Sequence, residues 1–367
     1  MKLRYKIGSG LLVLLLLAVI SLSVAISYSA DCGPAPSVAA GSETMKAVTY
    51  RCYGSPEVLE FGDIEKPVPA DDEVLVRIQA AAVNPLDWHY MRGSPYLMRL
   101  MSGLGAPKDS SFGVDFSGTV EAIGQDVRSF RPGDEVFGGK SGAYAEYIAI
   151  SEDRQIVHKP ESVTAQEAAA VPIAALTALQ ALRDKGQIQP GQKVLINGAS
   201  GGVGTFAVQI AKSFGAEVTG VCSTRNVELV RSLGADHVID YKKESYIESG
   251  NTWDLIIDNV GNHSLLANRK VLAPDGRFVS VGAPSGNWLG PLARPLMTTI
   301  LSPFVDQEFI TLMARMRKDD LATLAQLMEA GEMRSVIDRT WPLEQVAEAI
   351  RYSESGRARG KIIITVE

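Results

Sequence analysis

Residues 194–212, VLINGASGGVGTFAVQIAK, decide the fold because they combine a strand, a glycine-rich turn and a helix without a break. Residues 194–196 form a short apolar run that ends at Asn197-Gly198, as a strand ends in a turn. From Thr205 onward the apolar residues follow helical spacing, and Gly215 stands where a helix C-terminal glycine is expected. The sequence therefore predicts a helix that begins at the glycines.

The start of this predicted helix is suited to bind an anion. Its first backbone N–H groups and its positive dipole end point at whatever lies over the loop, and glycines permit a close approach of pyrophosphate. A glycine-rich turn alone is weak evidence, because many tight turns contain glycine. Here residues 217–221 read as a second strand, and a polar turn and a second helix up to Leu233 follow. The pattern is that of a βαβ dinucleotide-binding unit.

The end of the second strand predicts the cofactor. A site that prefers NAD places a carboxylate there to bind the ribose hydroxyls, whereas this chain has Ser223, Thr224 and Arg225. Hydroxyls and a guanidinium accept a 2′-phosphate, and a carboxylate would repel it. We therefore predict NADPH. The alternative interpretation is that Arg225 is an ordinary solvated arginine.

Length and charge exclude several classes of function. The 367 residues suffice for two domains, and the 46% hydrophobic and 21% charged fractions are those of a globular protein. The net charge of −6 comes without any long basic run, so we expect no nucleic-acid partner.

The cysteines and histidines indicate neither a disulfide framework nor a metal site. Cys32, Cys52 and Cys222 are far apart in sequence and form no Cys-x-x-Cys pair, so neither a disulfide framework nor a four-cysteine zinc site is expected. The histidines have no ligand-like spacing. They are His89, His158, His237 and His263.

The N-terminus predicts attachment to a membrane. Residues 7–30 carry no charge and are long enough to span a bilayer. Lys2, Arg4 and Lys6 precede them, so the segment is a signal-anchor or a long signal peptide, and its length favours an uncleaved anchor. Residues 31–44 read as a tether. The side of the catalytic domain stays open, because the basic residues favour export whereas NADPH is made in the cytoplasm.

The rest of the chain changes from strands to alternating strands and helices. Short predicted strands indicate a mostly β domain, and they cover residues 46–50, 74–83, 116–123, 134–137 and 143–150. Thr164 and Glu167 form a predicted capping box at the start of a helical stretch. Further predicted strands of an open parallel sheet cover residues 237–239, 255–257 and 277–281, followed by a helix over 343–352 and a final strand over 361–366.

Several stretches together resemble a known family. From Met45 to Glu367 the chain resembles the zinc-free quinone oxidoreductase branch of the medium-chain dehydrogenase/reductase superfamily, near its reticulon-4-interacting-protein type. Seven motifs in the same order carry this resemblance. They are Tyr53-Gly-Ser-Pro-Glu-Val-Leu59, Asn84-Pro-Leu-Asp87, Gly113-Val-Asp-Phe-Ser-Gly118, Pro132-Gly-Asp134, Ala174-Ala-Leu-Thr-Ala178, Gly198-Ala-Ser-Gly-Gly-Val-Gly204 and Arg357-Ala-Arg-Gly-Lys361.

The resemblance implies an α/β protein with two domains and an active site in the cleft between them. We expect a GroES-like β domain and a Rossmann domain with a doubly wound parallel sheet, preceded by an N-terminal hydrophobic helix. The expected boundaries are 1–44 for the anchor or signal segment and tether, 45–160 for the GroES-like catalytic domain, 161–305 for the Rossmann NADPH-binding domain, and 306–367 for a C-terminal return that completes the catalytic domain.

The resemblance also excludes a zinc-dependent alcohol dehydrogenase. Zinc-dependent members carry a cysteine near Asn84 and Gly-His-Glu where this chain has Gly113-Val114-Asp115. Valine cannot bind zinc, so we expect no metal. What remains is hydride transfer to an electron-poor carbon, as in quinones and α,β-unsaturated carbonyl compounds.

The family pattern assigns site residues by position. For the cofactor they are Thr177, Ser200, Gly201, Gly202, Val203, Gly204, Ser223, Arg225, Tyr241, Asn259, Gly282, Ala358 and Arg359. Asn84 and Asp87 are predicted to orient the reactants, and Tyr53 and Tyr96 to contact the substrate oxygen. Each of these polar residues, Asp87 included, has a purely structural role as its alternative. The proton source stays open, with solvent as one option.

Two functions remain in competition. The first is an NADPH-dependent quinone or enone reductase, and the second is a non-catalytic NADPH-binding scaffold or redox-sensing module on the same fold. The presence of Asn84 and Asp87 favours the enzyme. The partner is then a small-molecule substrate whose identity depends on the shape of the cleft. The oligomeric state stays open, with a homodimer as one option.

Overall fold

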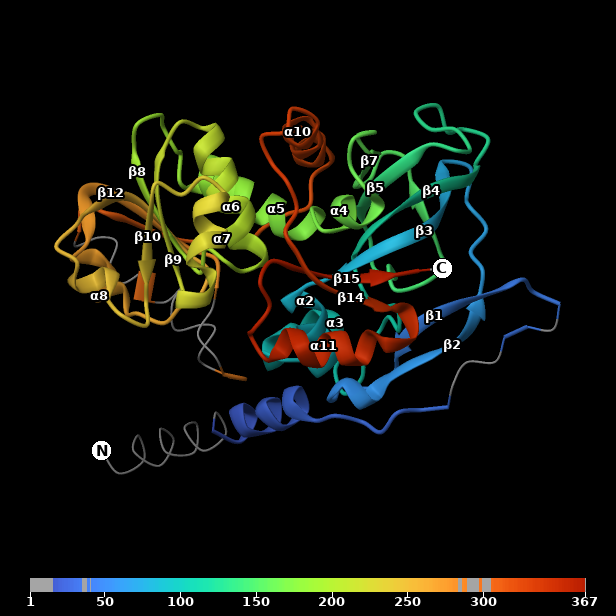
Figure 1. Ribbon diagram of the computed structural model, residues 1–367. Coiled ribbons are helices and arrows are strands. Elements are labelled where there is room, and N and C mark those ends of the chain that lie inside the picture. Colours follow the sequence, from blue (N-terminus) through green and yellow to red (C-terminus); the bar gives the residue numbers. More distant parts are fainter. Residues whose placement is uncertain are drawn as a thin grey trace, which may run out of the picture.

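The computed structural model describes residues 16–34, 38–39, 41–282, 286–288, 297–298 and 305–366. Two lobes, each built on its own sheet, lie side by side, with helices α4 (Ala165–Ala169) and α5 (Pro172–Leu179) between them (Figure 1). We name them after the domains expected from the sequence. The nucleotide lobe contains the sheet formed within residues 193–311, and the catalytic lobe contains the sheet formed within residues 73–158 and 337–365.

The nucleotide lobe contains a parallel sheet of six strands in the order β10-β9-β8-β11-β12-β13. The strands are β8 (Lys193–Asn197), β9 (Glu217–Cys222), β10 (His237–Asp240), β11 (Trp253–Asp258), β12 (Leu272–Ser280) and β13 (Glu308–Thr311). The strand order reverses between β8 and β11, and a crevice at the carboxyl ends of the strands is expected at such a switch point. The predicted α/β class with a parallel sheet is confirmed.

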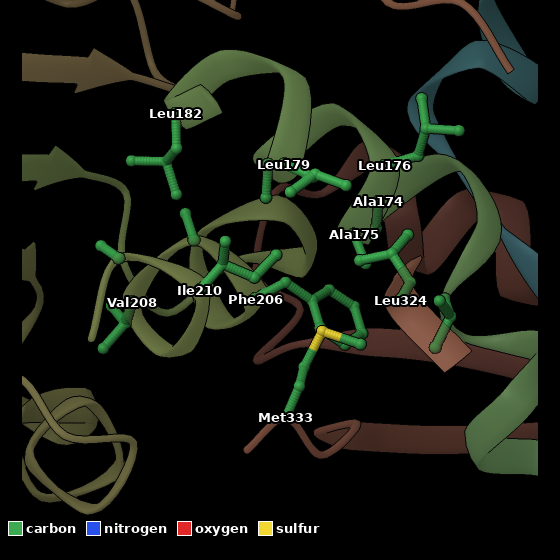
Figure 2. Close-up of a cluster of buried hydrophobic side chains, with 14 of the residues drawn as sticks. Ala174, Ala175, Leu176, Leu179, Leu182, Phe206, Val208, Ile210, Leu324 and Met333 are labelled. Atoms are coloured by element: carbon green, nitrogen blue, oxygen red, sulfur yellow. The ribbon is translucent and has the colours of Figure 1, made fainter. Parts of the chain in front are cut away.

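Both faces of this sheet are buried, because its side chains alternate between two cores. Val194 and Ile196 of β8 pack in the core on the side of α6 (Gly202–Ser213), whereas Leu195 packs in the core on the side of α8 (Leu265–Arg269). On the first side, side chains of α5 and the following turn face α6 (Figure 2). The labelled members are Ala174, Ala175, Leu176, Leu179, Leu182, Phe206, Val208, Ile210, Leu324 and Met333. This packing fixes α5 against the helix that begins at the glycine loop.

The catalytic lobe is built on a sheet of seven strands in the order β14-β15-β3-β4-β5-β7, with β6 paired to β3. The strands are β3 (Glu73–Val83), β4 (Asp115–Ile123), β5 (Glu135–Gly139), β6 (Tyr147–Ser151), β7 (Ile156–His158), β14 (Ile337–Pro342) and β15 (Lys361–Thr365). β15 pairs antiparallel with β3, with Ile363 opposite Ala82, so the C-terminal part of the chain joins the sheet of the first part. The residue boundaries of the domains remain a prediction.

Shorter elements complete the chain. A two-stranded ribbon, β1 (Thr44–Tyr50) and β2 (Leu59–Glu65), lies beside the catalytic lobe. The remaining helices are α2 (Pro85–Arg92), α3 (Arg99–Ser102), α7 (Val227–Ser232), α10 (Lys318–Glu329) and α11 (Val346–Glu354). The short helical turns are η1 (Pro56–Val58), η2 (Tyr96–Met98), η3 (Gln180–Lys185), η4 (Thr224–Asn226), η5 (Tyr246–Glu248) and η7 (Leu343–Gln345). The predicted capping box is confirmed, since Glu167 N donates to Thr164 Oγ1 over 3.2 Å and Thr164 N donates to Glu167 Oε2 over 2.9 Å.

The predicted membrane localisation is contradicted. Residues 7–15 of the apolar segment lie outside the described residues, and residues 16–27 form a helix. Within the described ranges no helix is long and apolar enough to cross a membrane. The full-length hydrophobic helix of the predicted fold is therefore unconfirmed.

The structure contains one disulfide that the spacing of the cysteines did not predict. Cys32 and Cys52 form a disulfide with their Cα atoms 4.8 Å apart. The segment after helix 16–27 returns to the end of β1, so cysteines 20 residues apart in sequence become neighbours. Only the course of the chain shows that these two cysteines meet. Cys222 is buried and takes no part in a disulfide.

Candidate cofactor and substrate cleft

A cleft of about 630 Å³ lies at the carboxyl ends of β8, β9 and β11, between the two lobes. The glycine loop and the residues after β9 line it from the nucleotide lobe. Val83, Asn84, Pro85 and Ile362 line it from the catalytic lobe. The cleft therefore lies at the switch point of the sheet, where such folds bind their ligands.

The glycine loop brings backbone N–H groups to this cleft. α6 begins at Gly202, as predicted, and a Cβ atom on Gly204 would lie 2.1 Å from the Gly198 carbonyl oxygen, so only glycine fits at that position. A Cβ atom on Gly201 would meet no protein atom closer than 3.5 Å. Gly201 is thus not required by protein packing, and its missing side chain leaves room for a ligand close to the backbone.

Ser223, Arg225 and Tyr241 line the cleft at the end of β9. A hydrogen bond orients the Arg225 side chain, since its Nη2 donates to the Arg357 carbonyl over 2.8 Å. Asn226, which the sequence analysis missed, is buried here and donates to Ser200 Oγ over 2.8 Å and to Ser223 Oγ over 3.3 Å. It joins the glycine loop to this corner. The only feature of the sequence that could have indicated Asn226 is its position directly before α7.

The carboxylate of Asp240, to which the sequence analysis assigned no role, lies near the end of β9. β10 pairs with β9 so that Asp240 stands opposite Cys222. Asp240 Oδ1 accepts a hydrogen bond from Lys242 N over 3.0 Å, and its Oδ2 lies 3.6 Å from Lys243 Nζ. Asp240 does not belong to the residues that line the cleft. Desolvation opposes its ionisation, but hydrogen bonds with the Thr224 side chain and the Lys242 backbone lower the pKa of Asp240, so its charge contacts both the turn after β10 and the residue between Ser223 and Arg225.

Two buried oxygen atoms fit a bound dinucleotide. Asn259 lines the cleft and donates through Nδ2 to the Asn197 carbonyl over 3.0 Å, which leaves its Oδ1 without a hydrogen bond inside the described part of the chain. The same holds for Asn226 Oδ1. Hydroxyl or amide groups of a nicotinamide dinucleotide can donate to such acceptors. The residues present therefore fit this class of cofactor.

The structure gathers most, but not all, of the predicted cofactor residues. Those that line the cleft are Ser200, Gly201, Gly202, Val203, Gly204, Ser223, Arg225, Tyr241, Asn259 and Ala358. Thr177, Gly282 and Arg359 do not line it. The Thr177 hydroxyl donates to the Ile173 carbonyl over 2.7 Å within α5, and a Cβ atom on Gly282 would lie 2.3 Å from the Asn259 carbonyl oxygen. The roles assigned to these three residues remain predictions.

Asn84 and Asp87 lie at the catalytic end of the cleft, but only Asn84 lines it. Asp87 Oδ2 accepts hydrogen bonds from Asn84 N over 2.8 Å and from the Tyr144 hydroxyl over 2.7 Å, so this carboxyl group caps α2. Burial raises the pKa of Asp87 to about 7. Any role of Asp87 in orienting reactants is therefore exerted through the start of α2. Lys361 and Asp115, which contact Asn84, were missed.

Tyr53 and Tyr96 lie away from this cleft. The Tyr53 hydroxyl donates to the Gly103 carbonyl over 2.9 Å, and the Tyr96 ring packs edge-on against Trp288 at 4.9 Å. The buried guanidinium of Arg99 stacks on both rings, at 4.4 and 4.8 Å. It also donates to the carbonyls of residues 26, 27 and 28 at the end of helix 16–27. The predicted contact of these tyrosines with substrate stays a prediction.

The described side chains offer no metal ligand set. Among these residues no group of three or more His, Cys, Asp or Glu could hold a metal ion. Cys222 lines the cleft, and burial raises the pKa of its thiol to about 11, so the thiol stays protonated at neutral pH.

Comparison with known proteins agrees with this geometry. Residues 70–161 match the family described as the alcohol dehydrogenase GroES-like domain, and residues 233–364 match the family described as zinc-binding dehydrogenase. The chain is 36% identical to "NAD(P)H oxidoreductase RTN4IP1, mitochondrial" of Bos taurus, over 89% of this chain and 90% of that protein. It is 34% identical to "Quinone-oxidoreductase QR1, chloroplastic" of Triphysaria versicolor, over 87% and 98%.

Solved structures give the same result. The quinone oxidoreductase from Coxiella burnetii superimposes with a TM-score of 0.78 at 30% sequence identity, covering 89% of this chain and all of that one. The quinone oxidoreductase of Pseudomonas syringae pv. Tomato DC3000 superimposes with a TM-score of 0.72 at 29% identity. The chain therefore belongs to the quinone oxidoreductase branch of the medium-chain dehydrogenase/reductase superfamily.

Proposed function

We propose that this protein is an NADPH-dependent, zinc-independent oxidoreductase that transfers a hydride to a quinone or an α,β-unsaturated carbonyl compound. The observation that carries the proposal is the composition of the cleft, in which a glycine loop is followed by a cation and two hydroxyl groups, from Arg225, Ser223 and Tyr241. The family binds a nicotinamide cofactor, and relatives are named as NAD(P)H and quinone oxidoreductases.

The choice of NADPH rests on charge. The 2′-phosphate distinguishes NADPH from NADH, and a guanidinium with nearby hydroxyls is a suitable receptor for it. The backbone carbonyl of Arg357 orients Arg225, and Asn226 orients Ser223. The groups are thus fixed before the phosphate arrives, which reduces the entropic cost of binding.

Different residues along the cleft would bind the cofactor and orient the substrate. The N–H groups of the glycine loop would hold the pyrophosphate, and Asn259 would accept a hydrogen bond from the cofactor. Bound NADPH would supply a hydride for a two-electron reduction of the substrate. Asn84 and the walls of the cleft would orient the acceptor carbon. Such orientation alone can lower a barrier substantially.

The zinc-independent part of the proposal rests on Val114 and Asn84. Val114 stands where zinc-dependent members carry a histidine, and the segment around Asn84, near which they carry a cysteine, contains none, so neither zinc ligand is replaced. A quinone or enone carbon is already electron-poor. It therefore accepts a hydride without the Lewis acid that an alcohol dehydrogenase needs.

The second candidate function, a non-catalytic NADPH-binding scaffold or redox-sensing module, is not favoured. The cleft extends from the glycine loop to Asn84, so the catalytic lobe contributes residues to the same cleft. A scaffold would need only the nucleotide lobe. NADPH binding without turnover of any quinone or enal would support it instead.

The test combines a cofactor comparison with a substrate panel. Arg225→Ala should raise the Kd of NADPH roughly tenfold to a hundredfold, the scale of about 1–3 kcal/mol for a charged hydrogen bond, and leave the Kd of NADH nearly unchanged. The matched control is Arg231→Ala, which removes an exposed arginine of α7 that pairs with Glu228. Equal losses for both cofactors would refute the NADPH assignment. Wild-type protein should oxidise NADPH with quinones or enals in the panel.

A further inference from the structure

A buried ion pair lies at the floor of the cleft, where Lys361 lines the cleft beside Asn84 and Asp115 lies behind them, and neither the fold nor the proposed chemistry accounts for the pair. Lys361 is the first residue of β15 and is 2% exposed, and Asp115 is the first residue of β4 and is fully buried. The Lys361 Nζ and Asp115 Oδ2 atoms are 3.6 Å apart. Replacing a buried ion pair by apolar side chains is often neutral or stabilising, so stability alone does not require this pair.

The two charges fix the orientation of the Asn84 side chain. Lys361 Nζ donates to Asn84 Oδ1 over 2.6 Å, and Asn84 Nδ2 donates to Asp115 Oδ2 over 2.9 Å. An ammonium only donates and a carboxylate only accepts, so the amide oxygen must face the lysine and the amide nitrogen the aspartate. In a flipped amide the nitrogen would face the Lys361 ammonium, donor against donor, and the oxygen would face the Asp115 carboxylate, acceptor against acceptor. Asn84 is thus held in one orientation where it lines the cleft.

The same residues connect the cleft floor to the glycine loop. Gly360 N donates to the Ser200 carbonyl over 2.9 Å, and the next residue is Lys361, whose Cδ would lie 3.3 Å from a Cβ atom on Gly202. β15 begins between the two lobes (Figure 1). One peptide unit thus joins the loop predicted to bind pyrophosphate to the side chain that holds Asn84.

Asp115 connects the start of α5 to Asn84 and Lys361. The backbone N–H of Ile173, at the start of α5, donates to Asp115 Oδ1 over 3.1 Å. The negative charge therefore lies at the positive end of a helix that packs against α6. The carboxylate holds Asn84 and the start of α5 together.

We propose that Lys361 is a positioning residue which, together with Asp115, holds the Asn84 amide and sets the floor of the cleft relative to the glycine loop. The inference rests on the proposed function, because it gives that function a residue that orients the nicotinamide end of the bound cofactor. Lys361 acts through Asn84 and is not itself assigned a proton transfer.

The first test is Lys361→Met, which keeps the length of the side chain and removes its charge. Misplacement of the cleft floor by about an ångström should lower kcat on the order of a hundredfold, while the KM of the acceptor and the Kd of NADPH change by less than about threefold. Lys361→Met/Asp115→Asn is the second variant, because it leaves no unpaired buried charge and keeps an acceptor for Ile173 N. Lys193→Met, on the exposed side of β8, is the matched control and should behave as wild type.

A double-mutant cycle tests whether Lys361 acts through Asn84. Asn84→Ala alone should lower kcat, but in the Lys361→Met background it should lower it by less than about twofold further, because the amide is no longer held. The fluorescence anisotropy of bound NADPH gives a readout without turnover. It should fall in both Lys361 variants, since a less constrained nicotinamide moves more freely.

The outcomes separate the two proposals. A folded Lys361→Met protein with wild-type kcat and wild-type anisotropy would overturn the positioning role, and so would additive effects of the Lys361 and Asn84 substitutions. If the wild-type protein binds NADPH but turns over no quinone or enal, the proposed function fails. The anisotropy comparison then decides the role of Lys361 by itself.

Discussion

Replacing Asp87 with asparagine should change how the stability of the protein depends on pH. The Asp87 side chain is 2% exposed, and its Oδ2 accepts hydrogen bonds from Asn84 N and the Tyr144 hydroxyl. Its Oδ1 makes no hydrogen bond with any residue that the structure describes. Burial therefore penalises the ionised form and raises the pKa of Asp87 from 3.8 to about 7.

The sign and the size of the effect follow from this shift. The pKa is higher in the folded than in the unfolded state, so the contribution to stability is fully present below pH 4 and is lost as the pH rises through 7. A shift of about 3 pKa units at about 1.4 kcal/mol each gives a loss of up to about 4 kcal/mol. Asparagine carries no charge, and its Oδ1 can still accept both hydrogen bonds. Asp87→Asn should thus gain stability relative to wild type as the pH rises.

The assay is urea unfolding of both proteins at several pH values between 4 and 8. The quantity to compare is the difference between their free energies of unfolding, because titration of the groups that do not interact with Asp87 cancels in it. Asp71→Asn, at an exposed position, is the control and should give a difference that does not change with pH. A flat difference for Asp87→Asn would refute the reasoning, since it would mean that the Asp87 carboxyl group ionises as freely as one in water.

Three further predictions concern the metal, the glycine loop and the core. Prolonged chelation should leave activity intact and the purified protein without stoichiometric zinc, as measured by elemental analysis; one zinc per chain together with loss of activity on its removal would contradict this. Gly204→Ala should weaken NADPH binding and lower the Tm, because its Cβ would lie 2.1 Å from the Gly198 carbonyl oxygen, and an unchanged Kd would speak against a rigid loop. Phe206→Ala, at a fully buried position of the core in Figure 2, should lower the free energy of unfolding by about 3–5 kcal/mol in a urea titration.

Features that depend on neighbours along the chain could be predicted from the sequence. The start of α6 at the glycines, the left-handed Gly215 after it and the Thr164–Glu167 capping box are all confirmed. These depend on backbone freedom, helical spacing and hydrogen bonds that reach no further than one turn. The motif order also indicated the family, since each motif marks a turn or a helix start that the fold needs.

Contacts between distant segments were decided only by the tertiary structure. The sequence analysis singled out Asn84, but not its partner Lys361, which is 277 residues away and lies within hydrogen-bond distance because β15 pairs with β3. The Cys32–Cys52 disulfide depends in the same way on the course of the chain. Asp87 looked like a cleft residue and instead caps α2 beneath the cleft. A residue type and its spacing define local conformation, whereas the partner of a charge or a thiol depends on which strands pair and in which register.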